Sequence, residues 1–219
     1  MASAAPRVQA VFWDIDGTLI DTEELHYQVI ADWCRDRGFP LTPQANDQLL
    51  GKSMAEKWEI LSRLFPFDSD EARFRADCAR IYEERVHREL ERSETVAVFR
   101  RIQDLGIPQA CVSNGDPQVV TANLKALGLS SAVAFTISGE DVSQGKPAPE
   151  PYLLAAQKLG LSPDQCMAVE DSRVGVASAK AAGMVAVGWP AADAEPLEED
   201  MCTHLVTDPG DFPWHHFPA

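Results

Sequence analysis

The chain alternates short apolar runs with helix-like segments through most of its length after residue 106. Five apolar runs have the length of strands, and they cover residues 8–13, 107–112, 132–137, 166–169 and 185–188. None of these runs alternates cleanly between apolar and polar side chains, which is typical of strands covered on both faces of a parallel sheet. Helices are predicted between the later runs, at residues 117–127, 151–159 and 172–182, because a glycine follows each segment. The alternation predicts an α/β fold with a doubly wound parallel sheet.

One interval in this pattern is too long for a single crossover helix. Residues 14–106 separate the first two runs, whereas a crossover needs only about a dozen residues. Apolar residues recur there at three- and four-residue steps, the spacing of one helix face: Leu25, Val29 and Trp33; Met54, Trp58, Leu61 and Phe65; Phe74, Cys78 and Ile81. We therefore expect an all-helical domain at residues 21–90, inserted into a core formed by residues 1–20 and 91–219.

Charge and composition limit the classes of function. The 219 residues include 34 acidic and 19 basic side chains, a formal net charge of −15. Such an acidic surface repels phosphate backbones and anionic lipids, so we expect neither a nucleic-acid-binding nor a membrane-surface protein. The sequence has no apolar stretch of bilayer length, and its five cysteines form no CxxC pair. These features predict a cytoplasmic protein with reduced thiols, and they leave its oligomeric state open.

Polar side chains cluster directly after the predicted strands. They are Asp14, Asp16 and Thr18 after the first run, Ser113 and Asn114 after the second, Lys146 in the loop beyond the third, and Glu170 and Asp171 after the fourth. Each group alone is typical of a turn or a helix cap. In an open parallel sheet, however, the carboxyl ends of the strands share one edge, where ligands bind. Several carboxylates at one edge repel each other and lower stability unless a cation neutralises them. We therefore expect these residues to form one site that binds a cation.

The residue types at this edge predict phosphoryl chemistry. Oxygen ligands without His or Cys favour a hard cation, and Mg²⁺ suits a small site that keeps water. A cation, Lys146 and hydroxyl donors together would bind an anion with several oxygens, most simply a phosphoryl group. Asp14 can then act as nucleophile and form an aspartyl-phosphate. Asp16 can protonate the leaving oxygen and afterwards deprotonate the hydrolytic water.

The same residues resemble the four ordered motifs of the haloacid dehalogenase-like (HAD) hydrolase superfamily. Residues 14–26 and 145–183 especially resemble the branch that holds phosphoglycolate phosphatases, sugar-phosphate phosphatases and β-phosphoglucomutases. The resemblance implies a Rossmann-like core, a helical cap domain after the first motif, and Mg²⁺-dependent phosphoryl transfer. Its second aspartate, Asp16, favours phosphate chemistry over dehalogenation.

Roles are implied for each motif residue by its position. Asp14 would be nucleophile and metal ligand, Asp16 would be acid/base and bind the metal through its carbonyl, Thr18, Ser113, Asn114 and Lys146 would bind phosphate, and Glu170 and Asp171 would hold the metal. One departure is the segment 92–96, which lacks the Pro-Gly pair that relatives usually have there, so the return hinge of the cap is expected to differ.

Two residues of the helical insertion are further candidates for substrate contact. His26 lies near the entry to the insertion, where relatives often carry a histidine, and a polar helix face is the alternative interpretation. Lys52, in Gly51-Lys-Ser, matches the specificity loop of the resembling family, although a solvated lysine between helices fits equally well. The tripeptide does not indicate a P-loop, because Asn46 stands where that motif needs glycine.

The predicted function is therefore Mg²⁺-dependent hydrolysis of a small phosphorylated metabolite, such as a sugar phosphate or a phosphoglycolate-like ester. One alternative is a β-phosphoglucomutase-like mutase, which Met54 disfavours because such mutases place an arginine at this position. Another is a non-catalytic relative that binds phosphate or protein. Trp214-His215-His216 near the end is expected to be a tail that packs on the core, since two adjacent histidines cannot form a metal site alone.

Overall fold

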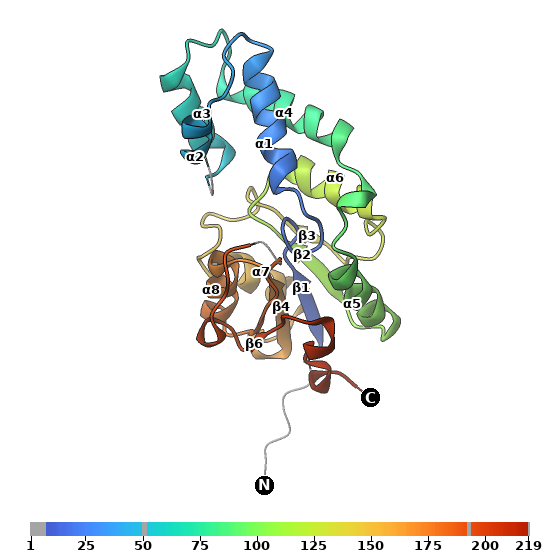
Figure 1. Ribbon diagram of the computed structural model, residues 1–219. Coiled ribbons are helices and arrows are strands. Elements are labelled where there is room, and N and C mark those ends of the chain that lie inside the picture. Colours follow the sequence, from blue (N-terminus) through green and yellow to red (C-terminus); the bar gives the residue numbers. More distant parts are fainter. Residues whose placement is uncertain (1–7, 50–51, 192–193, 219) are drawn as a thin grey trace. The chain divides into compact units, whose positions relative to one another are not determined.

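The computed structural model describes residues 8–49, 52–191 and 194–218. The chain forms two compact units (Figure 1). We call them the sheet unit, which comprises Met1–Asp21 and Arg88–Ala219, and the helical unit, Thr22–His87.

The sheet unit is built on six strands. They are β1 (Ala10–Trp13), β2 (Gln109–Val112), β3 (Thr136–Ile137), β4 (Cys166–Glu170), β5 (Val185–Gly188) and β6 (His204–Leu205). Their order in the sheet is β3-β2-β1-β4-β5-β6, and each neighbouring pair is parallel. The predicted doubly wound α/β fold is confirmed. The prediction of a third strand over residues 132–137 is mostly wrong, because the N–H of Ala132 donates to the carbonyl of Leu129 and closes a turn there.

Helices cover both faces of this sheet. They are α5 (Ser93–Asp104), α6 (Pro117–Leu127), α7 (Glu150–Leu159) and α8 (Arg173–Ala181), with short 3-10 turns η1 (Arg88–Leu90), η2 (Pro163–Gln165), η3 (Glu199–Met201), η4 (Pro209–Asp211) and η5 (Trp214–His216). Figure 1 shows α7 and α8 on one side of the sheet and α5 on the other. As predicted, α6 and α7 end at glycines, Gly128 and Gly160, which adopt the left-handed conformation at φ of 65° and 67°.

The central strand β1 shows why its sequence does not alternate. Phe12 packs into the apolar cluster that contains Tyr152 of α7 and Val176 of α8. On the other face, the Trp13 ring lies 5.6 Å from the Phe99 ring of α5, measured between centroids. All four residues of β1 are buried, as expected for a strand covered on both faces.

The helical unit contains α1 (Glu23–Arg35), α2 (Pro43–Asp47), α3 (Met54–Leu64) and α4 (Glu71–Arg85). Aromatic side chains form its core: the Trp33 ring makes edge contacts with Phe67 and Phe74, each with centroids 4.9 Å apart. The Ser53 hydroxyl and the Glu56 carboxylate form a capping box at the start of α3. Packing and capping therefore account for helices at the predicted positions.

The segments before and after the helical unit pair with each other inside the sheet unit. The N–H of Asp21 donates to the carbonyl of Leu90 at 2.8 Å, and the N–H of Arg92 donates to the carbonyl of Leu19 at 3.0 Å. The Arg92 guanidinium also donates to the carbonyls of Gly17 and Trp189. The loop that follows β1 is therefore tied to the start of α5.

No helix among the described ranges is both long and apolar enough to cross a membrane. The five cysteines are buried and free.

Candidate active site

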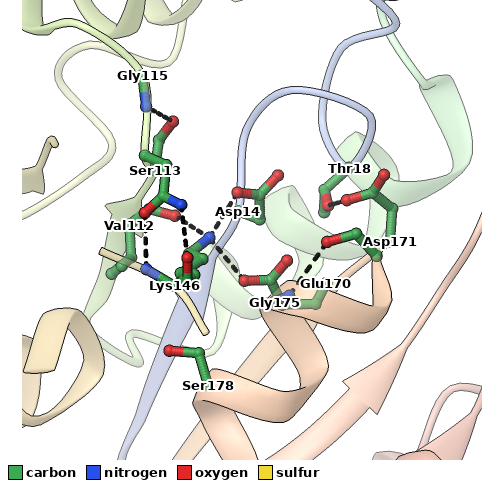
Figure 2. A network of polar contacts seen from close by, with 12 residues as sticks. Asp14, Thr18, Val112, Ser113, Gly115, Lys146, Glu170, Asp171, Gly175 and Ser178 are labelled. Atoms are coloured by element: carbon green, nitrogen blue, oxygen red, sulfur yellow. Dashed lines mark hydrogen bonds and ion pairs between the residues drawn. The ribbon is translucent and has the colours of Figure 1, made fainter. Parts of the chain in front are cut away.

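The centre of the sheet brings two predicted motifs together. β1 and β4 are neighbours, and the strand order reverses between them, which is the place where open α/β sheets bind ligands. Asp14 follows β1 directly, and its N–H donates to the carbonyl of Val169 in β4 at 3.0 Å. Glu170 ends β4 and Asp171 follows it. Adjacent parallel strands thus place three carboxylates at one edge (Figure 2).

Lys146 lies at the middle of this group. Its ammonium nitrogen is 2.6 Å from Asp14 Oδ1 and 2.6 Å from Glu170 Oε1, and it donates to the carbonyl of Val112 at 2.7 Å. The Lys146 side chain is only 4% exposed. Burial alone would lower its pKa, but the two carboxylates more than offset that effect and the pKa is raised. Lys146 is therefore a fixed positive charge.

One lysine does not neutralise the three carboxylates. Burial raises the pKa of Asp14 well above its ordinary value, and the Glu170 and Asp171 charges raise it further, against the opposing effect of Lys146. Burial, followed by repulsion from Glu170, raises the pKa of Asp171 to about 6. Oxygen atoms of the three carboxylates lie within 4.8 Å of one another. The site as it stands has an excess of negative charge that a cation would relieve.

The donor atoms fit a hard divalent cation. Glu170 Oε2 is buried and accepts no hydrogen bond from any residue in the described ranges, although such an orphaned oxygen costs about 1–3 kcal/mol. Space around it is kept by Gly175 of α8, where an added Cβ would lie 1.8 Å from this oxygen. The donors that meet here are all oxygens, the set that Mg²⁺ prefers. Asp14, Glu170 and Asp171 are thus the residues that could hold it.

Thr18, Ser113 and Asn114 make different contacts around this group. The Thr18 hydroxyl donates to Asp171 Oδ1 at 3.1 Å. Ser113 Oγ accepts the N–H of Gly115 at 2.9 Å. Asn114 exchanges two hydrogen bonds with the backbone of Lys146, donating at 3.0 Å and accepting at 2.9 Å. The Asn114 amide therefore positions the lysine loop, a role that the sequence did not suggest.

Sequence reasoning missed three residues that orient the motif side chains. Asn123 of α6 is fully buried and donates to Asp16 Oδ1 at 2.9 Å. The Tyr152 hydroxyl of α7 donates to Glu170 Oε1, and Gly175 leaves room for the same carboxylate. A buried polar residue on an otherwise apolar helix face is the one signal that could have pointed to Asn123 and Tyr152.

His26 and Lys52 belong to the helical unit, whereas the other predicted residues belong to the sheet unit. The His26 ring stacks on Tyr82 of α4, with centroids 4.7 Å apart. Lys52 is exposed and precedes the N-cap of α3, while Gly51 lies outside the described residues. The substrate roles of His26 and Lys52 stay predictions.

Comparisons with known proteins agree with the motifs. The haloacid dehalogenase-like hydrolase family matches residues 8–183, more than half of the chain. The chain is 32% identical to hexitol phosphatase A of Escherichia coli over 91% of this chain and 92% of that protein. It is 29% identical to the phosphorylated carbohydrates phosphatase of Thermotoga maritima, over 81% and 82% of the two chains.

A solved structure is similar in fold. CbbY from Rhodobacter sphaeroides, crystallised with phosphate, has a TM-score of 0.81 at 23% identity and is matched over 94% of this chain and 96% of that one. The family match, the full-length relative and the arrangement of carboxylates around Lys146 lead to one conclusion: the chain belongs to the haloacid dehalogenase-like hydrolase family.

Proposed function

We propose that this hydrolase is a Mg²⁺-dependent phosphatase that acts on a small phosphorylated metabolite, a sugar phosphate or a phosphoglycolate-like ester. The observation that carries the proposal is the buried Asp14 carboxylate, which lies beside the charged Lys146 and within reach of two further carboxylates. The substrate class is supported by the names of two relatives, hexitol phosphatase A and phosphorylated carbohydrates phosphatase.

Asp14 is the proposed nucleophile. Its carboxylate oxygen attacks phosphorus, the bond from phosphorus to the ester oxygen breaks, and Asp16 gives its proton to that leaving oxygen. Asp16 then takes a proton from water, whose oxygen attacks phosphorus and releases inorganic phosphate and free Asp14. Asn123 holds the Asp16 carboxylate at 2.9 Å, which orients it for both proton transfers.

The remaining motif residues would bind the negatively charged phosphate group and the metal ion. We assign phosphate binding to Lys146, Thr18, Ser113 and Asn114; Figure 2 shows the Lys146 ammonium beside the Asp14 carboxylate. A bound Mg²⁺ would lower the repulsion between Asp14 and the anionic substrate. Asp14, Glu170 and Asp171 are the proposed side-chain ligands, and the Asp16 carbonyl is the proposed backbone ligand.

Asp14→Asn tests the nucleophile. We expect a loss of at least about 10³-fold in kcat on p-nitrophenyl phosphate and on sugar phosphates, because the amide cannot form the acyl-phosphate. The matched control is Asp164→Asn, an exposed aspartate of η2, which should retain wild-type turnover. Rapid-quench trapping with ³²P-labelled substrate should label the wild-type protein and leave Asp14→Asn unlabelled. Wild-type-like hydrolysis by Asp14→Asn would contradict the assignment.

The same assays distinguish the alternatives. Conversion of a sugar 1-phosphate into the 6-phosphate with little free phosphate would identify a mutase. A protein that is inactive with Mg²⁺ across a broad panel of phosphorylated metabolites would be a binding relative instead.

We also propose that the helical unit is the cap and that Lys52, with His26 as a second candidate, contacts the leaving group. The support is that Lys52 is exposed beside the capped start of α3. Lys52→Ala should lower kcat/KM for the natural ester and change p-nitrophenyl phosphate hydrolysis much less, because the small ester offers the cap little to recognise. Equal losses on both substrates would contradict this role. A cytoplasmic location is proposed from the free cysteines, which persist in reducing compartments.

A further inference from the structure

Three of the five histidines of the chain meet at one edge of the sheet unit. His204 begins the edge strand β6, and His215 and His216 belong to the 3-10 turn η5. One ring nitrogen of each lies within 4.8 Å of the other two. His204 Nε2 and His216 Nε2 are 3.0 Å apart. His215 and His216, predicted from the sequence to belong to a tail that packs on the core, therefore have His204 as a third neighbour.

The backbone holds two of these histidines in place without any ion. β6 pairs with β5 in parallel register, with His204 opposite Val187. The carbonyl of His216 accepts the N–H of Val8 at 3.0 Å, and His216 as a residue is 6% exposed. His215 is exposed, and its ring lies 5.4 Å from the His204 ring and 4.4 Å from the His216 ring, measured between centroids. Two of the three histidines thus stand on backbone that is anchored by hydrogen bonds, and the third is exposed.

We propose that His204, His215 and His216 form a binding site for a borderline divalent transition metal of the Zn²⁺ class. Imidazole nitrogens suit Zn²⁺, Cu²⁺ and Ni²⁺, whereas Mg²⁺ prefers oxygen ligands. Zn–N bonds of about 2.0–2.1 Å in a tetrahedron place the ligand nitrogens roughly 3.4 Å apart. The nitrogen separations, 3.0 Å for one pair and up to 4.8 Å for the others, need adjustments of little more than an ångström.

The site would join the end of the chain to the edge strand. Three imidazoles leave one position for water, the ligand count of an accessible zinc site. The metal would replace the hydrogen bond between His204 and His216 and would add its binding free energy to the stability of η5 on β6. The carboxylates at the active site offer only oxygen, so the two sites select different ions, and this inference does not depend on the proposed phosphatase activity.

The test is metal binding by the full-length chain in saturating Mg²⁺, which occupies the oxygen site. We expect calorimetric titration with Zn²⁺ to give one tight site per chain, and Co²⁺ to give the visible absorption of a low-coordinate nitrogen site. His215→Ala is the first variant because that side chain is exposed. It should weaken Zn²⁺ binding at least about tenfold and abolish the Co²⁺ spectrum. His87→Ala, which removes an exposed histidine of the helical unit, is the matched control.

His204→Gln separates ligation from packing, because the amide can still hydrogen-bond to His216 while it is a poor zinc ligand. We expect this variant to fold with an unchanged melting temperature without zinc and to lose the zinc-induced rise in melting temperature seen in the wild type. The proposal is overturned if the wild type binds no stoichiometric Zn²⁺, or if His215→Ala binds it equally well. Zinc binding that is lost in Asp171→Asn but kept in His215→Ala would also overturn it.

Discussion

Gly175→Ala should damage the active site through a single methyl group. An alanine Cβ at this position would lie 1.8 Å from Glu170 Oε2 and 2.1 Å from the carboxyl carbon. The carboxylate would have to retreat by more than an ångström, yet it is only 1% exposed and is held by Lys146 and Tyr152. It therefore cannot swing into solvent, and the substitution must distort its contact with the lysine.

The size of the effect follows from two opposing contributions. Overpacking of a closed site costs about 1–3 kcal/mol. In the opposite direction, alanine has a higher helix propensity than glycine, which stabilises the helix by up to about 1 kcal/mol. A net loss of about 1–2 kcal/mol in the free energy of unfolding would lower Tm by roughly 2–8 °C in a chain of this length. Function should suffer more, because displacing Glu170, a proposed Mg²⁺ ligand, should raise the Mg²⁺ requirement about 10- to 100-fold.

The assay is initial-rate hydrolysis of p-nitrophenyl phosphate against Mg²⁺ concentration, together with thermal unfolding. Val174→Ala is the matched control, because Val174 is the preceding residue of α8 and is 47% exposed. It should change neither the Mg²⁺ dependence nor turnover. If Gly175→Ala keeps the wild-type Mg²⁺ dependence and Tm, the reasoning that Glu170 needs this space is refuted.

Four further outcomes are expected. Tyr152→Phe removes the hydroxyl that donates to Glu170 and should raise the Mg²⁺ concentration needed for half-maximal rate about tenfold, with little change in far-UV circular dichroism. Asp16→Asn should still give a burst of p-nitrophenol, since that leaving group needs no acid, but slow steady-state turnover; equal losses of burst and steady state would contradict the acid/base role. Arg92→Ala removes donors to the carbonyls of Gly17 and Trp189 and should lower kcat more than KM, measured on a sugar phosphate. The pKa of Asp171, about 6 in the fold and 3.8 ordinarily, means that the metal-free native chain binds this proton more tightly than the unfolded chain. Its stability relative to Asp171→Asn should therefore increase as pH falls from 6 towards 4, and Mg²⁺ at neutral pH should raise the wild-type Tm; a pH-independent difference would contradict this.

The sheet and the convergence of the motifs could be predicted because local patterns and topology determine them. β1, β2, β4 and β5 are short apolar runs covered on both faces, and parallel strands necessarily bring the residues after them to one edge. The third strand was predicted too long because residues 132–135 are also apolar, and no local pattern shows that a turn closes at Ala132.

The supporting residues could not be predicted because their partners are distant in sequence. Tyr152 meets Glu170 only when α7 packs on the sheet, and Asn123 meets Asp16 across 107 positions. The histidine cluster depends likewise on the pairing of β6 with β5, which places His204 beside a turn that follows ten residues later. A sequence shows which residues can do chemistry, while packing decides which of them are brought into contact.

The paired segments at residues 19–21 and 90–92 make the helical unit an exchangeable module. Hydrogen bonds between Asp21 and Leu90 and between Arg92 and Leu19 hold the two ends of the insertion together within the sheet unit. For the sheet unit, Thr22–His87 is therefore equivalent to one long loop that is closed at its base. Because the entropy of a closed loop grows only with the logarithm of its length, doubling the insertion would cost about 0.6 kcal/mol. An insertion of another size can therefore replace this one while the paired segments at its ends are kept, and a chimaeric chain of this kind would test the proposal that the helical unit recognises the leaving group.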